Sequence, residues 1–192
     1  MTTVRDIEQY LYAWAPRELA ESWDNVGLLV GDPEAEVRRV LVALDVTPQV
    51  VAEAIEKDCQ LIAAHHPVMN CAWNQVQTVR TDDRQGRVLT ELIRHGIAAI
   101  CMHTNLDAAE GGVNDVLADL FGIRQRTVFA DGCGRVGDID PITVPELAAL
   151  AQCKLAALCN APDTGAAVQV KFADTGKPVH RLAVIRGPGG RL

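Results

Sequence analysis

Hydrophobic residues in the middle of the chain fall into short continuous runs, separated by longer segments of mixed character. Three continuous runs predict buried β-strands, at residues 40–44, 61–64 and 97–102. Between them, hydrophobic residues recur with the spacing of one helix face, at residues 47–58 and 84–95. Because continuous apolar strands that alternate with helices form parallel sheets covered on both faces, residues 38–122 predict an α/β fold.

The beginning of the chain adds a helix and a strand to this pattern. Residues 3–14 carry apolar residues at helical spacing, and Thr3 followed by Asp6 is typical of a helix start. The segment 23–31 (WDNVGLLVG) is short, apolar and punctuated by glycine, which indicates a strand bounded by turns rather than a helix. We therefore expect a parallel or mixed sheet with helices on both faces.

The residues after 127 have a different character. They comprise a glycine-rich turn or short strand, an alanine-rich helix and two further strands, at residues 131–137, 143–158, 166–173 and 180–185. We therefore expect two domains, an α/β domain at 1–126 that carries the chemistry and a second, incomplete α/β half at 127–192.

Composition and charge argue against several functions. The chain of 192 residues is 48% hydrophobic and 22% charged, as globular proteins are, and its net charge of −7 argues against nucleic acid as the main partner. Ser22 is the only serine and lies in no Gly-x-Ser-x-Gly motif, which argues against a serine nucleophile. The six cysteines form no Cys-x-x-Cys pair, and no apolar run approaches the length of a membrane span. We expect a cytoplasmic protein with reduced thiols and no membrane association.

Side chains that bind metals or transfer protons gather at the carboxyl ends of the predicted strands. The first strand is followed by Asp45, the second by His65 and His66, and the third by His103 and then Asp107. Ligands of open parallel sheets bind at this edge. Nitrogen and oxygen ligands without thiolates suit zinc, iron, manganese, nickel or cobalt. The sequence therefore predicts a site for one or two divalent transition metal ions.

Each of these residues also has a structural interpretation. Adjacent histidines at a strand end can turn toward one site, but such a pair can equally be hydrogen-bonded in a loop. His103 and Asp107 face the same side if their segment makes one helical turn, whereas Asp107 can instead cap the following structure. Asp45 precedes a predicted helix and is typical of a cap or turn residue. For Cys101 we expect core packing, and for His95 a structural place at the end of a helix.

Three motifs, in this order, resemble those of a known family. They are SWDNVGLLVG at 22–31, AHHP at 64–67 and HTNLD at 103–107, with a weaker GRVG at 134–137. Together they resemble the YbgI-like dinuclear metal-centre family, also described as Ngg-interacting-factor-three-like proteins or GTP cyclohydrolase 1 type 2 homologues. The resemblance covers essentially the whole chain.

The resemblance implies a cytoplasmic α/β protein that assembles as a toroidal homohexamer, with two divalent metals facing the central cavity. By motif match, His65, His66 and Asp107 resemble the metal ligands, and His103 is either a ligand or a neighbouring group. The family also has a His and a Glu beyond a glycine-rich turn that residues 187–190 resemble. Because the sequence ends at Leu192 before them, we expect a C-terminally shortened member whose hydrolysis of GTP or simple phosphoesters is weak or undetectable.

Two functions follow from these observations. The first is a metal-dependent hydrolase of the cyclohydrolase or phosphoester type, which acts on a small molecule through a metal-activated water, with His103 as a candidate general base. The second is a non-catalytic metal-binding, assembly or regulatory protein, in which a ring of subunits matters for interaction rather than for turnover. The presence of two metals with an open coordination position would distinguish the first from the second.

Overall fold

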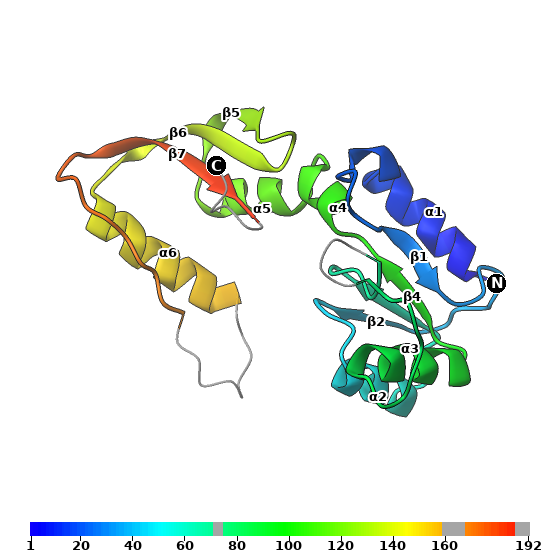
Figure 1. Ribbon diagram of the computed structural model, residues 1–192. Helices are drawn as coiled ribbons and strands as arrows, with labels where there is room; N and C mark the ends of the chain where they lie inside the picture. The colour runs from blue at the N-terminus through cyan, green and yellow to red at the C-terminus, as the bar shows by residue number, and fades with distance from the viewer. Residues whose placement is uncertain (71–74, 159–167, 187–192) are drawn as a thin grey trace. The chain divides into compact units, whose positions relative to one another are not determined.

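A computed structural model describes residues 1–70, 75–158 and 168–186 of the chain (Figure 1). The chain divides into two compact units, Met1–Gly112 and Val113–Leu192. The sequence analysis placed a domain boundary after residue 126, whereas the compact units divide earlier along the chain. The helix α5 (Val113–Leu120) belongs to the second unit, because it packs against the strands of that unit.

The first unit is built on a four-stranded sheet with the strand order β1-β4-β3-β2. Its strands are β1 (Gly27–Val30), β2 (Val40–Ala43), β3 (Leu61–Ala64) and β4 (Ala98–Cys101). The strands β2, β3 and β4 run parallel, and β1 pairs antiparallel with β4. The sheet is therefore mixed, as the sequence predicts.

Helices cover both faces of this sheet. One face packs against α1 (Val4–Trp14), and the other packs against α2 (Pro48–Glu56) and α3 (Arg84–Arg94). Within β4, Ala99 and Cys101 lie in the core shared with α2 and α3, whereas Ala98 and Ile100 lie in the core shared with α1. This alternation follows from the two-residue period of a strand and confirms the α/β fold. It also confirms the core position of Cys101, which is fully buried.

Local signals in the sequence account for where the helices of this unit begin. Thr3 and Asp6 form a reciprocal capping box at the start of α1, and the Thr47 hydroxyl accepts a hydrogen bond from the Val50 N–H at the start of α2. After β1, Gly31 has φ of +113°, and a Cβ there would lie 2.7 Å from Cα of Ala98. Only glycine fits this turn without strain, which explains the glycine that ends the strand.

The prediction that the first apolar run is buried is wrong for one face of β2. Val42 is 79% exposed and Val40 is 41% exposed, whereas Leu41 packs partly against the core. The reason is position, because β2 is an edge strand of the sheet. Its hydrophobic run alone does not distinguish an edge strand from a central one.

The second unit contains a three-stranded antiparallel sheet, with the order β5-β6-β7. Its elements after α5 are β5 (Arg124–Phe129), β6 (Gly134–Ile142), α6 (Val144–Leu158) and β7 (Val179–Ile185). The glycine-rich segment forms the turn between β5 and β6 and the start of β6. Ala118, Ile123 and Ile139 form its small buried core.

Two expectations for this unit need correction. The sequence pattern does not predict β5, because its side chains are mostly exposed and show no strong apolar alternation. The strand predicted at 166–173 is wrong for residues 168–173, which form no regular structure. Residues 166–167 and the glycine-rich turn at 187–190 lie outside the described residues.

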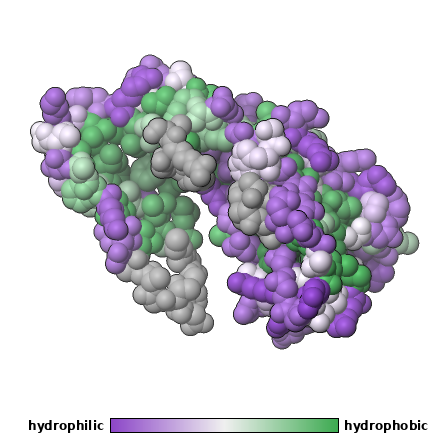
Figure 2. All heavy atoms as spheres, in the orientation of Figure 1, coloured by the Kyte–Doolittle hydropathy of each residue, from purple (hydrophilic) through white to green (hydrophobic). Residues whose placement is uncertain are grey.

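The helix α6 is apolar around most of its circumference but packs little. Among its fifteen residues only Ala148 is buried, while Leu150 and Leu158 are 36% and 62% exposed. Figure 2 shows hydrophobic residues on the surface of the second unit over this helix. No helix in the described ranges has both the length and the apolar character that crossing a membrane requires.

Candidate metal centre

Three histidine side chains meet at the carboxyl edge of the sheet in the first unit. Each of His65, His66 and His103 offers one ring nitrogen, and these nitrogens all lie within 4.8 Å of one another. The ring centroid of His65 lies 5.1 Å from that of His66 and 5.0 Å from that of His103. The sequence predicts this convergence, because all three residues directly follow neighbouring strands.

The sheet itself brings the histidines together. Ala64 at the end of β3 pairs in register with Cys101 at the end of β4, so both strands release the chain at the same edge. The backbone N–H of His66 still donates to Leu44 O at 2.9 Å, which ties the histidine pair to the end of β2. The ends of β3 and β4 therefore carry the three imidazoles, and the end of β2 anchors His66.

One turn of helix places Asp107 beside the histidines. The short helix α4 (Thr104–Ala108) follows β4, and the Asp107 N–H donates to His103 O at 3.0 Å. Asp107 lies inside this helix rather than at its start. Its Oδ1 lies 3.9 Å from Nε2 of His65, and both side chains are about nine-tenths buried. This separation suits two ligands of one ion, since each bond to a transition metal is about 2.0–2.2 Å long.

Asp24 supports His103 from the far side of the ring. Nδ1 of His103 lies 3.0 Å from both carboxylate oxygens of Asp24, whose side chain is completely buried. Asp24 also accepts hydrogen bonds from the backbone N–H and the hydroxyl of Thr104. Nδ1 of His103 therefore donates to Asp24, and in the neutral imidazole Nε2 carries the lone pair.

The surroundings of Asp24 hold it in the charged form. Burial by itself would raise the pKa of this carboxyl group, but the hydrogen bonds from His103 and Thr104 outweigh burial and lower its pKa from 3.8 to about 2. In the sequence, Asp24 stands only as part of the motif at 22–31, with no role predicted for it. The signal that could have found it is a charged residue in an otherwise apolar, strand-like segment.

Asp45 supports His66 in the same way. Its Oδ1 lies 2.7 Å from Nδ1 of His66, and the Asp45 side chain is 53% exposed. Asp45 follows β2, and Thr47 rather than Asp45 caps the next helix. The expectation of a cap or turn residue is therefore incomplete, because its carboxylate orients one of the clustered histidines.

Asn105 fixes the start of α4 and was also missed. It is fully buried, accepts from the His103 N–H at 3.0 Å and donates to Ala15 O at 2.8 Å. The chain after His103 is thereby tied to the end of α1. The other histidines lie elsewhere, His95 at the end of α3 near Glu91 and His180 in β7 of the second unit.

The donor set fits a transition metal ion. Three imidazoles converge, Oδ1 of Asp107 lies 3.9 Å from Nε2 of one of them, and two of the imidazoles are oriented by carboxylates that bind their other ring nitrogen. Carboxylate–histidine pairs of this kind are the usual support of metal-binding histidines, since they fix the ring and make it more basic. Nitrogen and oxygen donors of this kind are compatible with zinc, iron, manganese, nickel and cobalt.

Known proteins are similar to this chain in sequence and fold. Residues 2–192 match the family Duf34/NIF3 (NGG1p interacting factor 3). A GTP cyclohydrolase 1 type 2 homolog of Listeria innocua is 45% identical over 117 residues, which are 61% of this chain and 31% of that protein. A GTP cyclohydrolase 1 type 2 homolog of Clostridium acetobutylicum is 33% identical over 197 residues, covering 97% of this chain and 68% of that protein. The chain thus spans about a third of the Listeria relative's length and about two thirds of the Clostridium relative's length.

A solved structure agrees with the sequence matches. The crystal structure of a hypothetical protein from Staphylococcus aureus superimposes with a TM-score of 0.82 at 30% sequence identity, covering 97% of this chain and 72% of that one. These matches confirm the resemblance drawn from the three motifs. The chain belongs to the Duf34/NIF3 (NGG1p interacting factor 3) family.

Proposed function

We propose that the first unit binds a divalent transition metal ion through His65, His66 and Asp107 and serves as a metal-dependent hydrolase of a small molecule. The observation that carries this proposal is the pair of supported imidazoles, His66 held by Asp45 at 2.7 Å and His103 held by Asp24 at 3.0 Å. Structural histidines do not need their rings turned toward a common point. The relatives named as GTP cyclohydrolase homologs support a hydrolytic reaction.

The residues of the site have distinct roles in this proposal. A bound divalent ion supplies Lewis acidity, which polarises a water or a substrate oxygen. His65, His66 and Asp107 hold the ion, and the buried position of His65 and Asp107 keeps bulk water away from that side. His103 keeps a proton on Nδ1 because the Asp24 carboxylate accepts a hydrogen bond from it. Nε2 then either completes the ligand set or accepts a proton from the attacking water.

Hydrolysis assays test the catalytic part of this proposal. GTP and p-nitrophenyl phosphate are each incubated with the protein and added zinc, manganese, iron, nickel or cobalt. We expect any turnover to depend on added metal, to be abolished in the double variant His65→Ala, His66→Ala and to be retained in the control His95→Ala, because His95 lies on an exposed helix end. Turnover that does not depend on metal, or equal turnover in the double variant, would contradict a hydrolase acting through this site.

The second candidate is a non-catalytic metal-binding protein that acts by assembly. The exposed apolar side chains of α6, including Leu150 and Leu158, support association with further chains. We propose a homo-oligomer, and the family resemblance favours a hexameric ring. Metal binding without hydrolysis, in a protein that forms a defined oligomer, is the result that favours this second function.

A further inference from the structure

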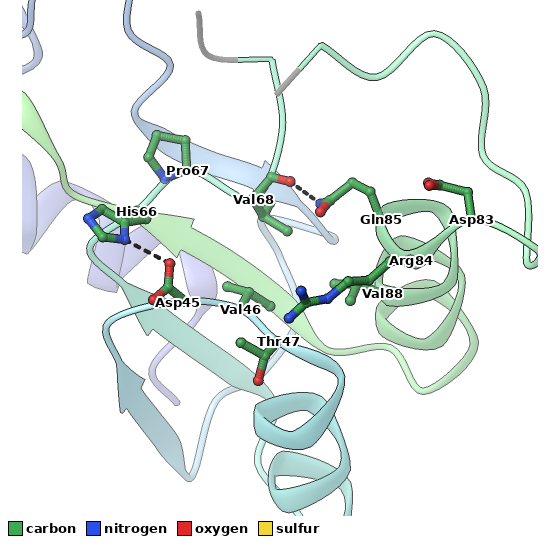
Figure 3. A pocket seen from close by; sticks show the side chains of 10 residues that line it. All are labelled: Asp45, Val46, Thr47, His66, Pro67, Val68, Asp83, Arg84, Gln85 and Val88. Atoms are coloured by element: carbon green, nitrogen blue, oxygen red, sulfur yellow. Dashed lines mark hydrogen bonds and ion pairs between the residues drawn. The ribbon is translucent and has the colours of Figure 1, made fainter. Parts of the chain in front are cut away.

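A cleft lies beside the metal centre in the first unit, between the loop after β3 and the starts of α2 and α3 (Figure 3). Its volume is about 750 Å³, within the range of small-molecule sites. His66 and Asp45 line one side, so a molecule in the cleft reaches the histidine cluster directly. Much of the remaining wall is apolar and consists of Val46, Pro67, Val68 and Val88.

Arg84 is the positive group of this cleft. It begins α3, and Figure 3 shows its guanidinium extending from that helix across the cleft toward Thr47. No hydrogen bond or ion pair joins Arg84 to another residue in the part of the chain that the structure describes. Most other arginines in the described ranges are paired, for example Arg94 with Glu91 at 3.0 Å.

The acidic residues of the cleft are already engaged. Asp83 caps α3, because its carboxylate accepts from the Gly86 N–H at 2.9 Å. Asp45 accepts from His66 at 2.7 Å. Gln85 donates its side-chain amide to Val68 O and is thereby held against the wall. The guanidinium of Arg84 is therefore the charged donor that remains available to a bound molecule.

We infer that this cleft binds the substrate of the hydrolase proposed above and that this substrate is a small organic anion. The inference rests on that proposed function. Arg84 would bind its carboxylate or phosphate group, since a guanidinium forms two parallel hydrogen bonds with either. The valines and Pro67 contact its apolar or planar body, and the reacting group lies toward His66. Arg84 is thus a specificity-determining residue outside the ligand set of the metal.

Binding measurements with matched probes test this inference without requiring turnover. Phenyl phosphate, benzoate and uncharged phenol share one ring and differ in charge. Their dissociation constants are measured by ligand-observed NMR titration of the full chain, both as purified and after dialysis against a chelator. The variants are Arg84→Ala, Arg84→Lys and the control Arg94→Ala, which removes an exposed arginine at the other end of the same helix.

We expect Arg84→Ala to weaken binding of at least one of the two anions by about tenfold, as loss of a charge-assisted hydrogen bond does. Arg84→Lys retains part of the affinity, Arg94→Ala retains all of it, and phenol binding does not depend on Arg84. Equal anion affinity of Arg84→Ala and the unaltered chain, equal loss in Arg94→Ala, or no binding of either anion at millimolar concentration would overturn the inference.

The two proposals fail separately in this design. Metal content measured in Arg84→Ala should equal that of the unaltered chain, because Arg84 is not among the clustered ligands. If anion binding depends on Arg84 but the chain binds no metal, only the proposed hydrolase is contradicted. A chain that binds metal but shows no Arg84-dependent anion binding contradicts the cleft alone.

Discussion

Nδ1 of His103 lies 3.0 Å from both carboxylate oxygens of Asp24, although the two residues are separated by 79 positions in the chain. The side chain of Asp24 is completely buried and also accepts two hydrogen bonds from Thr104. The segment before β1 and the segment after β4 are thereby joined at the metal centre. This contact fixes both the orientation of the His103 ring and the nitrogen that faces the other histidines.

Replacing Asp24 by Asn should weaken metal binding without removing any ligand. The amide cannot hold Nδ1–H of His103 as a carboxylate does, so the ring loses orientation and basicity. We expect the affinity for zinc to fall by about 10–100-fold, measured by competition with a chromophoric chelator. Asp45→Asn serves as the comparison and should have a smaller effect, because Asp45 is half exposed and water can replace it. Unchanged zinc affinity in Asp24→Asn would show that Asp24 does not support the site.

Asp24 should also make the stability of the first unit depend on pH in acid. The pKa of an aspartate carboxyl group is ordinarily 3.8 and that of Asp24 is about 2 in the folded chain, so the unfolded chain takes up a proton first as the pH falls. The stabilisation is complete above about pH 5, amounts to about 2 kcal/mol, and is lost as the pH falls toward 2.

Urea denaturation of the unaltered chain and of Asp24→Asn, between pH 6 and pH 2, measures this contribution. The difference in the free energy of unfolding between the two proteins should shrink as the pH falls through that interval. A difference that stays constant at every pH would contradict the lowered pKa of Asp24.

The sequence predicted the sheet and most of the cluster because both depend on local patterns. Strand ends followed by His65, His66 and His103 must meet at one edge once β3 and β4 pair in parallel. Asp24 was not found because its partner lies far away in the chain, and only the antiparallel pairing of β1 with β4 brings them together. The exposure of Val42 and the strand β5 were not predicted for a related reason. Both depend on which strands lie beside them in the sheet, and a local sequence pattern does not show this.

Neighbouring residues of α3 should differ sharply in their contribution to stability. Leu92 is fully buried against the sheet, whereas Ile93 is 65% exposed. We expect Leu92→Ala to lower the free energy of unfolding by about 2–4 kcal/mol, because it leaves a cavity. Ile93→Ala should change it by less than about 0.5 kcal/mol. Chemical denaturation measures both, and similar values for the two variants would contradict the packing of α3.

The apolar surface of α6 should promote self-association. Light scattering at micromolar concentration is expected to give a mass above the 20.7 kDa of one chain. The double variant Leu150→Glu, Leu158→Glu should shift the distribution toward the monomer, whereas Ile93→Glu in the first unit should not. A monodisperse species with the mass of a single chain would contradict this proposal.

Metal content measured by elemental analysis tests the central claim most directly. The unaltered chain is compared with His65→Ala, His66→Ala and with the control His95→Ala, His180→Ala, which also removes two histidines but leaves the cluster intact. All three proteins are loaded with zinc and freed of excess metal by gel filtration. We expect the unaltered chain and the control to retain the same amount of bound metal and the cluster variant to retain almost none. Equal metal content in all three proteins would contradict a metal centre at these histidines.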